Sequence, residues 1–233
     1  MKQKLLSTVR FLVIFSLIFT VTFAVMNFSS MKSFLMFYIS GQKTEDLLNA
    51  ATGQNIIAEI PLPNKSAKKL VAQEFPPLQL SPTPIDYRLI IPKTGTNVPL
   101  IDMPEKYAVD DLWGKFEKEV QESLRNGVVH YPGTAYPGQV GNVFFTGHSS
   151  YYPWDKGQYK DVFATLNQLN IGDEYVVFYN QEKFVYKINE KKEVRPSQVG
   201  VLDQAKDKKL STLMTCWPIG TTLKRLIVVA EEV

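Results

Sequence analysis

The chain has 233 residues, a formal net charge of +3 at neutral pH and a single cysteine. No long basic block is present, so the composition gives no reason to expect a nucleic-acid partner. One cysteine excludes an intrachain disulfide, and the lack of a CxxC motif or a His/Cys cluster argues against a zinc site. We therefore predict neither metal nor cofactor. Aromatic residues at 12% and many Val, Ile, Tyr and Phe runs favour a β-rich fold.

Residues 1–40 are predicted to form a cytoplasmic tip and a transmembrane anchor. Met1–Arg10 carries three basic residues, and Phe11–Phe28 is an uncharged run of 18. As a helix this run spans about 27 Å, close to the thickness of a bilayer core. The preceding positive charge predicts a cytoplasmic N-terminus and a single pass, with the rest of the chain outside. A cleaved signal peptide is the alternative. A second apolar patch, Phe34–Ile39, either extends the helix or lies at the membrane interface.

Residues 41–84 are predicted to form an extended spacer between the membrane and a folded domain. Six prolines and three lysines fall between Pro61 and Pro84, a composition that disfavours both helix and sheet. An alternative is that part of this segment folds over the active site as a lid.

Residues 85–233 are predicted to form the globular domain. Its first two strands are expected at Tyr87–Pro92 and Val98–Ile101. A helix is then expected from Asp110 to Leu124, because apolar residues recur at intervals of three or four, with Gly127 as its C-terminal stop. The helix places Trp113 and Phe116 in the core.

The second half of the domain alternates between strands and turns. Gly141–Thr146 is expected to be a strand, Asp161–Leu169 a helix, and Glu174–Tyr179 with Lys183–Asn189 a hairpin. Leu210–Cys216 predicts a strand that ends at the only cysteine.

Three side chains with matching chemistry stand at strand ends in this half. Cys216 ends one strand, Arg225 opens the strand after the following turn, and His148 follows Gly141–Gly147. The two-residue period of a strand places Cys216 on the same face as Met214. A thiol, an imidazole and a guanidinium are the parts of a thiol acyl-transfer site.

These segments resemble the sortases, the cysteine transpeptidases of bacterial surfaces, over roughly Tyr87 to Val233. Their motifs are most similar to those of class D, class E or otherwise unclassified members. The matching motifs are Thr212-Leu213-Met214-Thr215-Cys216 with Arg225, His130-Tyr131-Pro132-Gly133-Thr134, Pro137-Gly138, Gly141-Asn142 and Gly147-His148. The resemblance implies a closed β-barrel of about eight strands with a few short helices.

The chemistry needs each of the three residues in a separate role. Cys216 would be the nucleophile, and His148 would stabilise its thiolate and then protonate the departing amine. Arg225 would bind the carbonyl oxygen as negative charge develops there. With ordinary pKa values, only on the order of 1% of molecules near neutral pH would hold thiolate and imidazolium together. No carboxylate is obviously oriented on His148, so a Cys-His-Asp triad is not predicted.

Five further residues are candidates for substrate contact. Thr215 could donate through its amide or hydroxyl, and the long aromatic loop after His148 could line a substrate groove. The alternative for that loop is simple packing on the barrel. The candidates are Thr215, Ser149, Tyr151, Trp154 and Trp217. His130, the other histidine, is interpreted as structural, as its motif position in the resembled family implies.

By resemblance, the substrate would be an exported protein with an LPxTG-like sorting signal. The acceptor would be an amine of a cell-wall precursor or a pilin-type lysine, and the enzyme would be a single-pass protein of the cell membrane. Two rivals remain open: a cysteine peptidase on the same scaffold, and a non-enzymatic β-barrel that binds peptides and carries a silent thiol.

Overall fold

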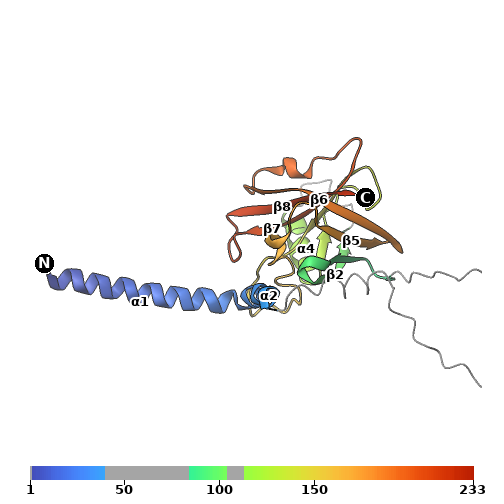
Figure 1. The fold of residues 1–233 in the computed structure, drawn as a ribbon. Coiled ribbons are helices and arrows are strands. Elements are labelled where there is room, and N and C mark those ends of the chain that lie inside the picture. Colours follow the sequence, from blue (N-terminus) through green and yellow to red (C-terminus); the bar gives the residue numbers. More distant parts are fainter. Residues whose placement is uncertain (1, 40–83, 104–112) are drawn as a thin grey trace, which may run out of the picture.

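The structure is a computed structural model that describes residues 2–39, 84–103 and 113–233. The predicted spacer therefore lies outside the described residues, apart from Pro84, and so does the expected start of the helix at Asp110. The described part consists of a long N-terminal helix, a second helix lying across its end, and a β-rich domain (Figure 1).

Eight strands form a closed barrel in the order β1-β2-β3-β4-β7-β8-β6-β5, which confirms the expected fold class. Two neighbouring pairs, β2/β3 and β4/β7, are parallel, and the others are antiparallel. The strands are β1 (Arg88–Ile91), β2 (Thr96–Asp102), β3 (Val128–His130), β4 (Gly141–Thr146), β5 (Glu174–Tyr179), β6 (Glu182–Val194), β7 (Lys209–Trp217) and β8 (Lys224–Glu232).

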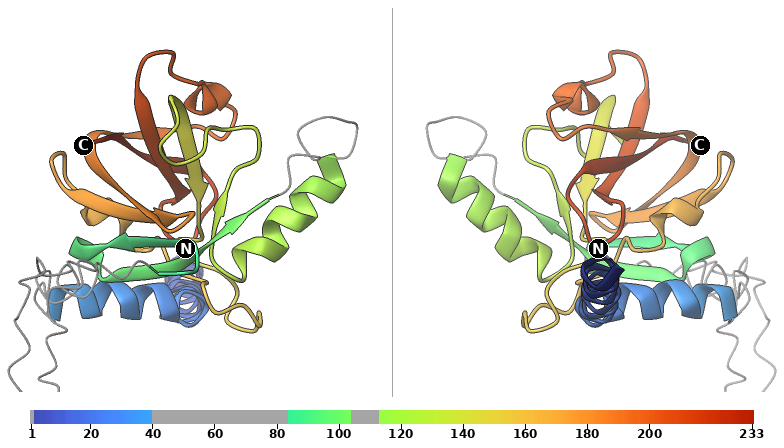
Figure 2. Two further views of the ribbon diagram at one scale, coloured as in Figure 1. Left: turned by 90° about the vertical axis from the view of Figure 1, so that its right-hand side faces the viewer. Right: turned by 90° about the vertical axis from the view of Figure 1, so that its left-hand side faces the viewer.

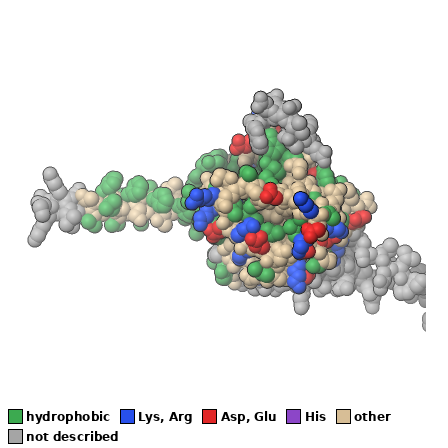
Figure 3. All heavy atoms as spheres, turned by 90° about the horizontal axis from the view of Figure 1, so that it is seen from above, with side chains coloured by type: hydrophobic (Ala, Val, Ile, Leu, Met, Phe, Trp, Pro, Cys, Tyr) green, Lys and Arg blue, Asp and Glu red, His purple; other side chains and the backbone are tan. Residues whose placement is uncertain are grey.

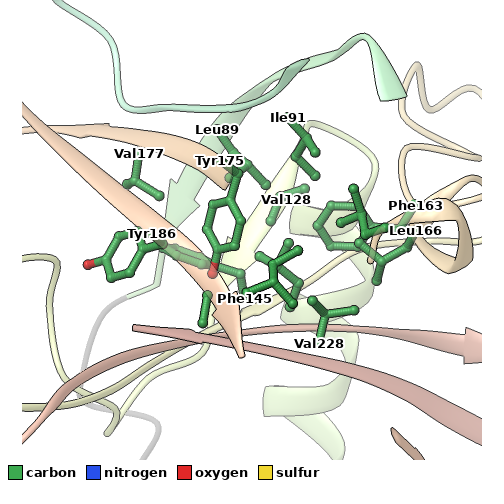
Figure 4. Close-up of a cluster of buried hydrophobic side chains, with 14 of the residues drawn as sticks. Leu89, Ile91, Val128, Phe145, Phe163, Leu166, Tyr175, Val177, Tyr186 and Val228 are labelled. Carbon is green, nitrogen blue, oxygen red and sulfur yellow. The ribbon is translucent and has the colours of Figure 1, made fainter. Parts of the chain in front are cut away.

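The barrel interior is filled by aliphatic and aromatic side chains from most of the strands (Figure 4). Tyr175 and Tyr186 are fully buried and stack with ring centroids 5.5 Å apart. The Tyr175 hydroxyl donates a hydrogen bond to the Ser211 carbonyl oxygen at 3.2 Å, so its polar tip is satisfied inside the core. The alternation of strand side chains thus gives one continuous core, with every second residue facing outward.

The predicted hairpin is β5 with β6, joined by a two-residue turn. Asn180 and Gln181 have φ values of 50° and 64°, the left-handed pair that matches the twist of antiparallel strands. β6 continues to Val194 and lies between β5 and β8, with a register shift between Ile188 and Glu190 in its pairing with β8.

Helix α4 (Trp113–Leu124) packs on the outside of the barrel and builds a second core. Phe116 is buried there with Val120 and Leu124, as its spacing predicts, while the side chain of Trp113 lies outside the described residues. Gly127 is not the helix stop that we expected. A Cβ at this position would lie 2.3 Å from the Pro99 carbonyl oxygen, so the residue allows close approach to β2 instead.

The expected helix at 161–169 is wrong. The segment is a series of turns that ends in η3 (Leu166–Gln168), a single 3₁₀ turn. The Phe163 amide donates to the His148 carbonyl oxygen at 2.9 Å, and the next amides bond three residues back. These three-residue bonds close turns and a 3₁₀ helix rather than the four-residue ladder of an α-helix.

Helix α1 (Lys2–Met26) contains the predicted anchor. Its segment Thr8–Met26 is long and apolar enough to cross a membrane, and none of that stretch is buried in the protein. Figure 3 shows hydrophobic side chains along α1, whereas basic and acidic side chains are interspersed over the barrel face in view. The apolar patch at Phe34–Ile39 does not extend this helix. It belongs to a separate helix, α2 (Phe28–Ile39).

Candidate functional site

Cys216 and Arg225 are direct neighbours across two antiparallel strands. β7 and β8 pair in a register that places Cys216 opposite Arg225. The buried interior residues of these strands are Leu213, Leu226 and Val228. Because side chains alternate along a strand, Cys216 and Arg225 both project from the outer surface of the barrel, near the end of β7 and the start of β8.

His148 reaches the same place from the neighbouring strand. β4 runs parallel to β7, with Thr146 paired to Met214. The register continues past the end of β4, since the Gly147 amide donates to the Met214 carbonyl oxygen at 3.1 Å. The next residues on the two chains are then Thr215 with Gly147, and Cys216 with His148. Adjacent strands are about 4.8 Å apart, so the two backbones meet within side-chain reach.

Gly147 permits this approach because it has no side chain. A Cβ there would lie 2.7 Å from the Phe163 ring. On the opposite side, the Thr215 hydroxyl donates to the Gly147 carbonyl oxygen at 2.7 Å and is buried. The backbone that carries His148 is therefore held between a packed ring and a hydrogen bond.

The three side chains open on one pocket of about 390 Å³. Its walls come from the outer strand face, helix α4, the loop after β4, the β7–β8 turn and the end of α1. The lining includes Cys216, His148, Arg225, Met214, Thr146, Tyr131, Val120, Gln121, Leu124, Tyr151, Tyr152, Gly220, Thr222, Met26 and Asn27.

The imidazole of His148 is sheltered from water. It stacks on the Tyr151 ring with centroids 4.4 Å apart, and its Nε2 is buried without a hydrogen-bond partner in the described part of the chain. Burial lowers its pKa from the ordinary 6.5 to about 4; the Asp155 carboxylate opposes the shift and Arg125 adds to it. Arg125 and Asp155 form an ion pair at 2.8 Å. His148 is therefore neutral in the resting site at neutral pH.

Arg225 is oriented by backbone contacts. Its Nη1 donates to the carbonyl oxygens of Thr222 at 3.2 Å and Lys224 at 3.1 Å. Within the described residues it forms no ion pair, so its charge is not neutralised by a protein carboxylate there. A fixed guanidinium beside a thiol suits recognition of a carbonyl oxygen that acquires negative charge.

The five weaker candidates fall into two groups. Thr215 and Tyr151 line the pocket, although the Thr215 hydroxyl is engaged with the Gly147 carbonyl oxygen. Ser149, Trp154 and Trp217 are not among the lining residues. Ser149 is buried below the loop, Trp154 is exposed and stacked on Tyr152, and Trp217 packs partly against the barrel core.

His130 lies in a separate buried network. Its Nδ1 is 2.8 Å from Asp102 Oδ1, and its Nε2 is 2.9 Å from the Ala135 carbonyl oxygen. The Tyr179 hydroxyl donates to Asp102 Oδ2 at 2.8 Å. Burial alone would raise the pKa of Asp102, but the hydrogen bonds from His130 and Tyr179 outweigh it and hold that pKa below its ordinary value. This network ties β2, β3 and β5 together, in agreement with the structural interpretation of His130.

Sequence reasoning missed the part of the pocket contributed by the N-terminal helix. Met26 and Asn27 line it, and a Cβ on Gly220 would lie 2.5 Å from Asn27 Oδ1. Neither residue belongs to a motif, so no local signal distinguishes them from the rest of the anchor. Among the described residues, no group of three or more His, Cys, Asp or Glu side chains could hold a metal ion.

Comparisons with known proteins agree on one family. A sortase domain model matches residues 89–233. Sortase D of Bacillus subtilis (strain 168) is 25% identical over 145 residues, which cover 61% of this chain and 67% of that protein.

Two solved structures extend the likeness. A Clostridium perfringens sortase D5 transpeptidase is 27% identical with a TM-score of 0.50, over 64% of this chain and 78% of that one. Sortase C1 of GBS pilus island 1 is 23% identical with a TM-score of 0.51 and resembles this chain in fold. The alignment with it spans 63% of the length of each chain.

Proposed function

Because this chain belongs to the sortase family, we propose that it is a membrane-anchored cysteine transpeptidase with Cys216, His148 and Arg225 as its catalytic residues. Its substrates are exported proteins with an LPxTG-like sorting signal. The observation that carries the proposal is the convergence of the three side chains, from β7, β8 and the end of β4, on one pocket.

The first half of the reaction forms a thioester. The Cys216 thiol gives its proton to His148, and the thiolate attacks the carbonyl carbon of the scissile peptide bond. Negative charge on the carbonyl oxygen is met by the Arg225 guanidinium. The carbon–nitrogen bond then breaks as the His148 imidazolium protonates the departing amine. Burial lowers the pKa of His148, which makes its imidazolium a readier proton donor in this step and a weaker base toward the Cys216 thiol in the first.

The second half transfers the acyl group. An amine attacks the thioester carbonyl, His148 accepts the proton that the amine loses, and the carbon–sulfur bond breaks to release Cys216. The acceptor is the amino group of a cell-wall precursor or a lysine of another surface protein. The apolar wall formed by Val120, Leu124 and Met214 suits the leucine and proline of a sorting signal.

Transfer and hydrolysis are separated by one experiment. The full chain in detergent would be incubated with an LPxTG-type peptide and either hydroxylamine or triglycine, with Cys216→Ala as the control. We expect ligated product and an acyl adduct on Cys216 detected by mass spectrometry. Hydrolysed peptide alone, even at high amine concentration, would identify a cysteine peptidase. A Cys216 that resists alkylation would favour a silent thiol, although its partial exposure argues against that.

The proposed location at the membrane is supported by α1. None of its segment Thr8–Met26 is buried by the described part of the chain, as a lipid-exposed helix requires. The basic residues before it orient the N-terminus to the cytoplasm and the barrel to the outside. Recovery of the full chain in the membrane fraction after an alkaline wash, and release by deletion of residues 2–26, tests the anchor.

A further inference from the structure

The second helix lies crosswise at the end of the anchor. Figure 1 shows α1 along its length and α2 nearly end-on, and Figure 2 shows the reverse, with α2 running beneath the barrel. The helices are separated at Asn27, which is buried against the β7–β8 turn at Gly220. If α1 spans the bilayer, α2 therefore runs along the membrane surface rather than away from it.

Three serines of α2 make hydrogen bonds to the barrel domain. The Ser30 hydroxyl is buried and donates to the Ser149 carbonyl oxygen at 2.8 Å. Ser29 and Ser33 both donate to Asp161 Oδ2, at 2.9 Å and 2.6 Å. These hydrogen bonds fasten α2 to the loop that follows His148 and to the turn after it.

The opposite face of α2 is apolar and exposed. Phe28, Met31, Leu35 and Tyr38 recur at helical spacing and are 67%, 50%, 57% and 63% exposed. A helix on the surface of a water-soluble domain turns apolar residues toward the domain, whereas these four are exposed. Lys32 is the one charged residue of the helix and suits a surface of anionic lipid headgroups.

A pair of aromatic side chains extends this apolar face beside the anchor. Trp154 and Tyr152 stack with centroids 5.0 Å apart and are 70% and 50% exposed. They belong to the loop after β4, the one that Ser30 holds, and Figure 2 shows this loop on the other side of α1 from α2. Trp and Tyr are the residues enriched at membrane–water interfaces.

We propose that the apolar face of α2, with Tyr152 and Trp154, lies in the interface of the lipid bilayer and holds the mouth of the catalytic pocket at the membrane surface. The inference rests on the proposed anchor, because α1 sets the membrane plane. Since Met26 and Asn27 line the pocket, the end of the span is part of the pocket wall. The pocket thus receives sorting signals where exported chains leave the bilayer.

Depth-dependent quenching in vesicles tests the inference on the full chain. A Cys216→Ala background removes the only cysteine, and single cysteines labelled with NBD replace Leu35 on α2, Leu17 in the middle of α1, or Val199 on the barrel. All three positions are exposed, so the label disturbs no packed core. The vesicles contain phosphatidylcholine and phosphatidylglycerol, with a doxyl group on acyl carbon 5 or carbon 12.

We expect the Leu35 label to be quenched more by the shallow doxyl than by the deep one, the Leu17 label more by the deep one, and the Val199 label by neither. Quenching at Leu17 without quenching at Leu35 would overturn the inference and leave the anchor intact. In that case, energy transfer between donor- and acceptor-labelled Leu35 positions would identify a second copy as the occupant of the face. Loss of quenching at Leu17 as well would refute the anchor itself.

Discussion

Acid should weaken the folded protein through His148, and the size of the effect follows from its burial. Its pKa falls from 6.5 in an exposed state to about 4 in the fold. Between these pH values the unfolded chain binds a proton that the native site does not bind. The free energy of unfolding therefore decreases as the pH falls from 6.5 to 4, and this contribution is constant below 4.

Each pKa unit corresponds to about 1.4 kcal/mol, so the loss through His148 is at most about 3.5 kcal/mol, and less to the extent that water reaches the ring. The His148→Gln variant removes the titrating group and should lose that much less stability between pH 7 and pH 4. Urea unfolding of the full chain in detergent, followed by tryptophan fluorescence, measures both proteins at each pH.

Carboxylates that also titrate in this range are common to both proteins, so the comparison isolates one side chain. Asp155→Asn provides a second check. Removing the carboxylate that favours protonated His148 should lower its pKa further and steepen the acid loss. Equal losses of stability in the wild type and His148→Gln would show that the ring is not desolvated, and the argument for a strongly acidic imidazolium would fail with it.

Three further substitutions test how the site is held. Gly147→Ala places a Cβ 2.7 Å from the Phe163 ring, so we expect about 1–3 kcal/mol of destabilisation and a loss of transpeptidation as His148 moves; unchanged kinetics would contradict the close packing. Thr215→Val leaves the Gly147 carbonyl oxygen buried without its donor and should cost about 1–3 kcal/mol in urea unfolding, whereas Thr215→Ser should not. Tyr179→Phe should raise the pKa of Asp102 and lower the free energy of unfolding by about 1 kcal/mol at neutral pH. Transpeptidation should be retained, because Tyr179 does not line the pocket. A large drop in rate would show that the His130 network and the pocket are coupled.

The local pattern of apolar and polar residues was sufficient to predict most of the barrel strands. The alternation at Leu210–Cys216 identifies β7 and the shared face of Cys216 and Met214, and the hairpin around Asn180 needs only local turn geometry. The same reasoning failed at 161–169. There the apolar spacing is helical, but the segment closes three-residue turns and a 3₁₀ helix, and Phe163 is tied to the His148 carbonyl oxygen, a contact that no local pattern reveals.

Sequence by itself determined which side chains could do chemistry, because residue type and strand periodicity are local properties. Tertiary structure decided that Cys216 faces Arg225 on the outer surface, and that β4 runs beside β7 to bring His148 to them. It also decided that Ser30 of α2 is buried against the barrel domain while Phe28, Met31, Leu35 and Tyr38 are exposed. These outcomes depend on how a closed barrel pairs strands that are distant in the chain, and on which surface each helix buries, so they follow from burial of the whole core rather than from any single segment.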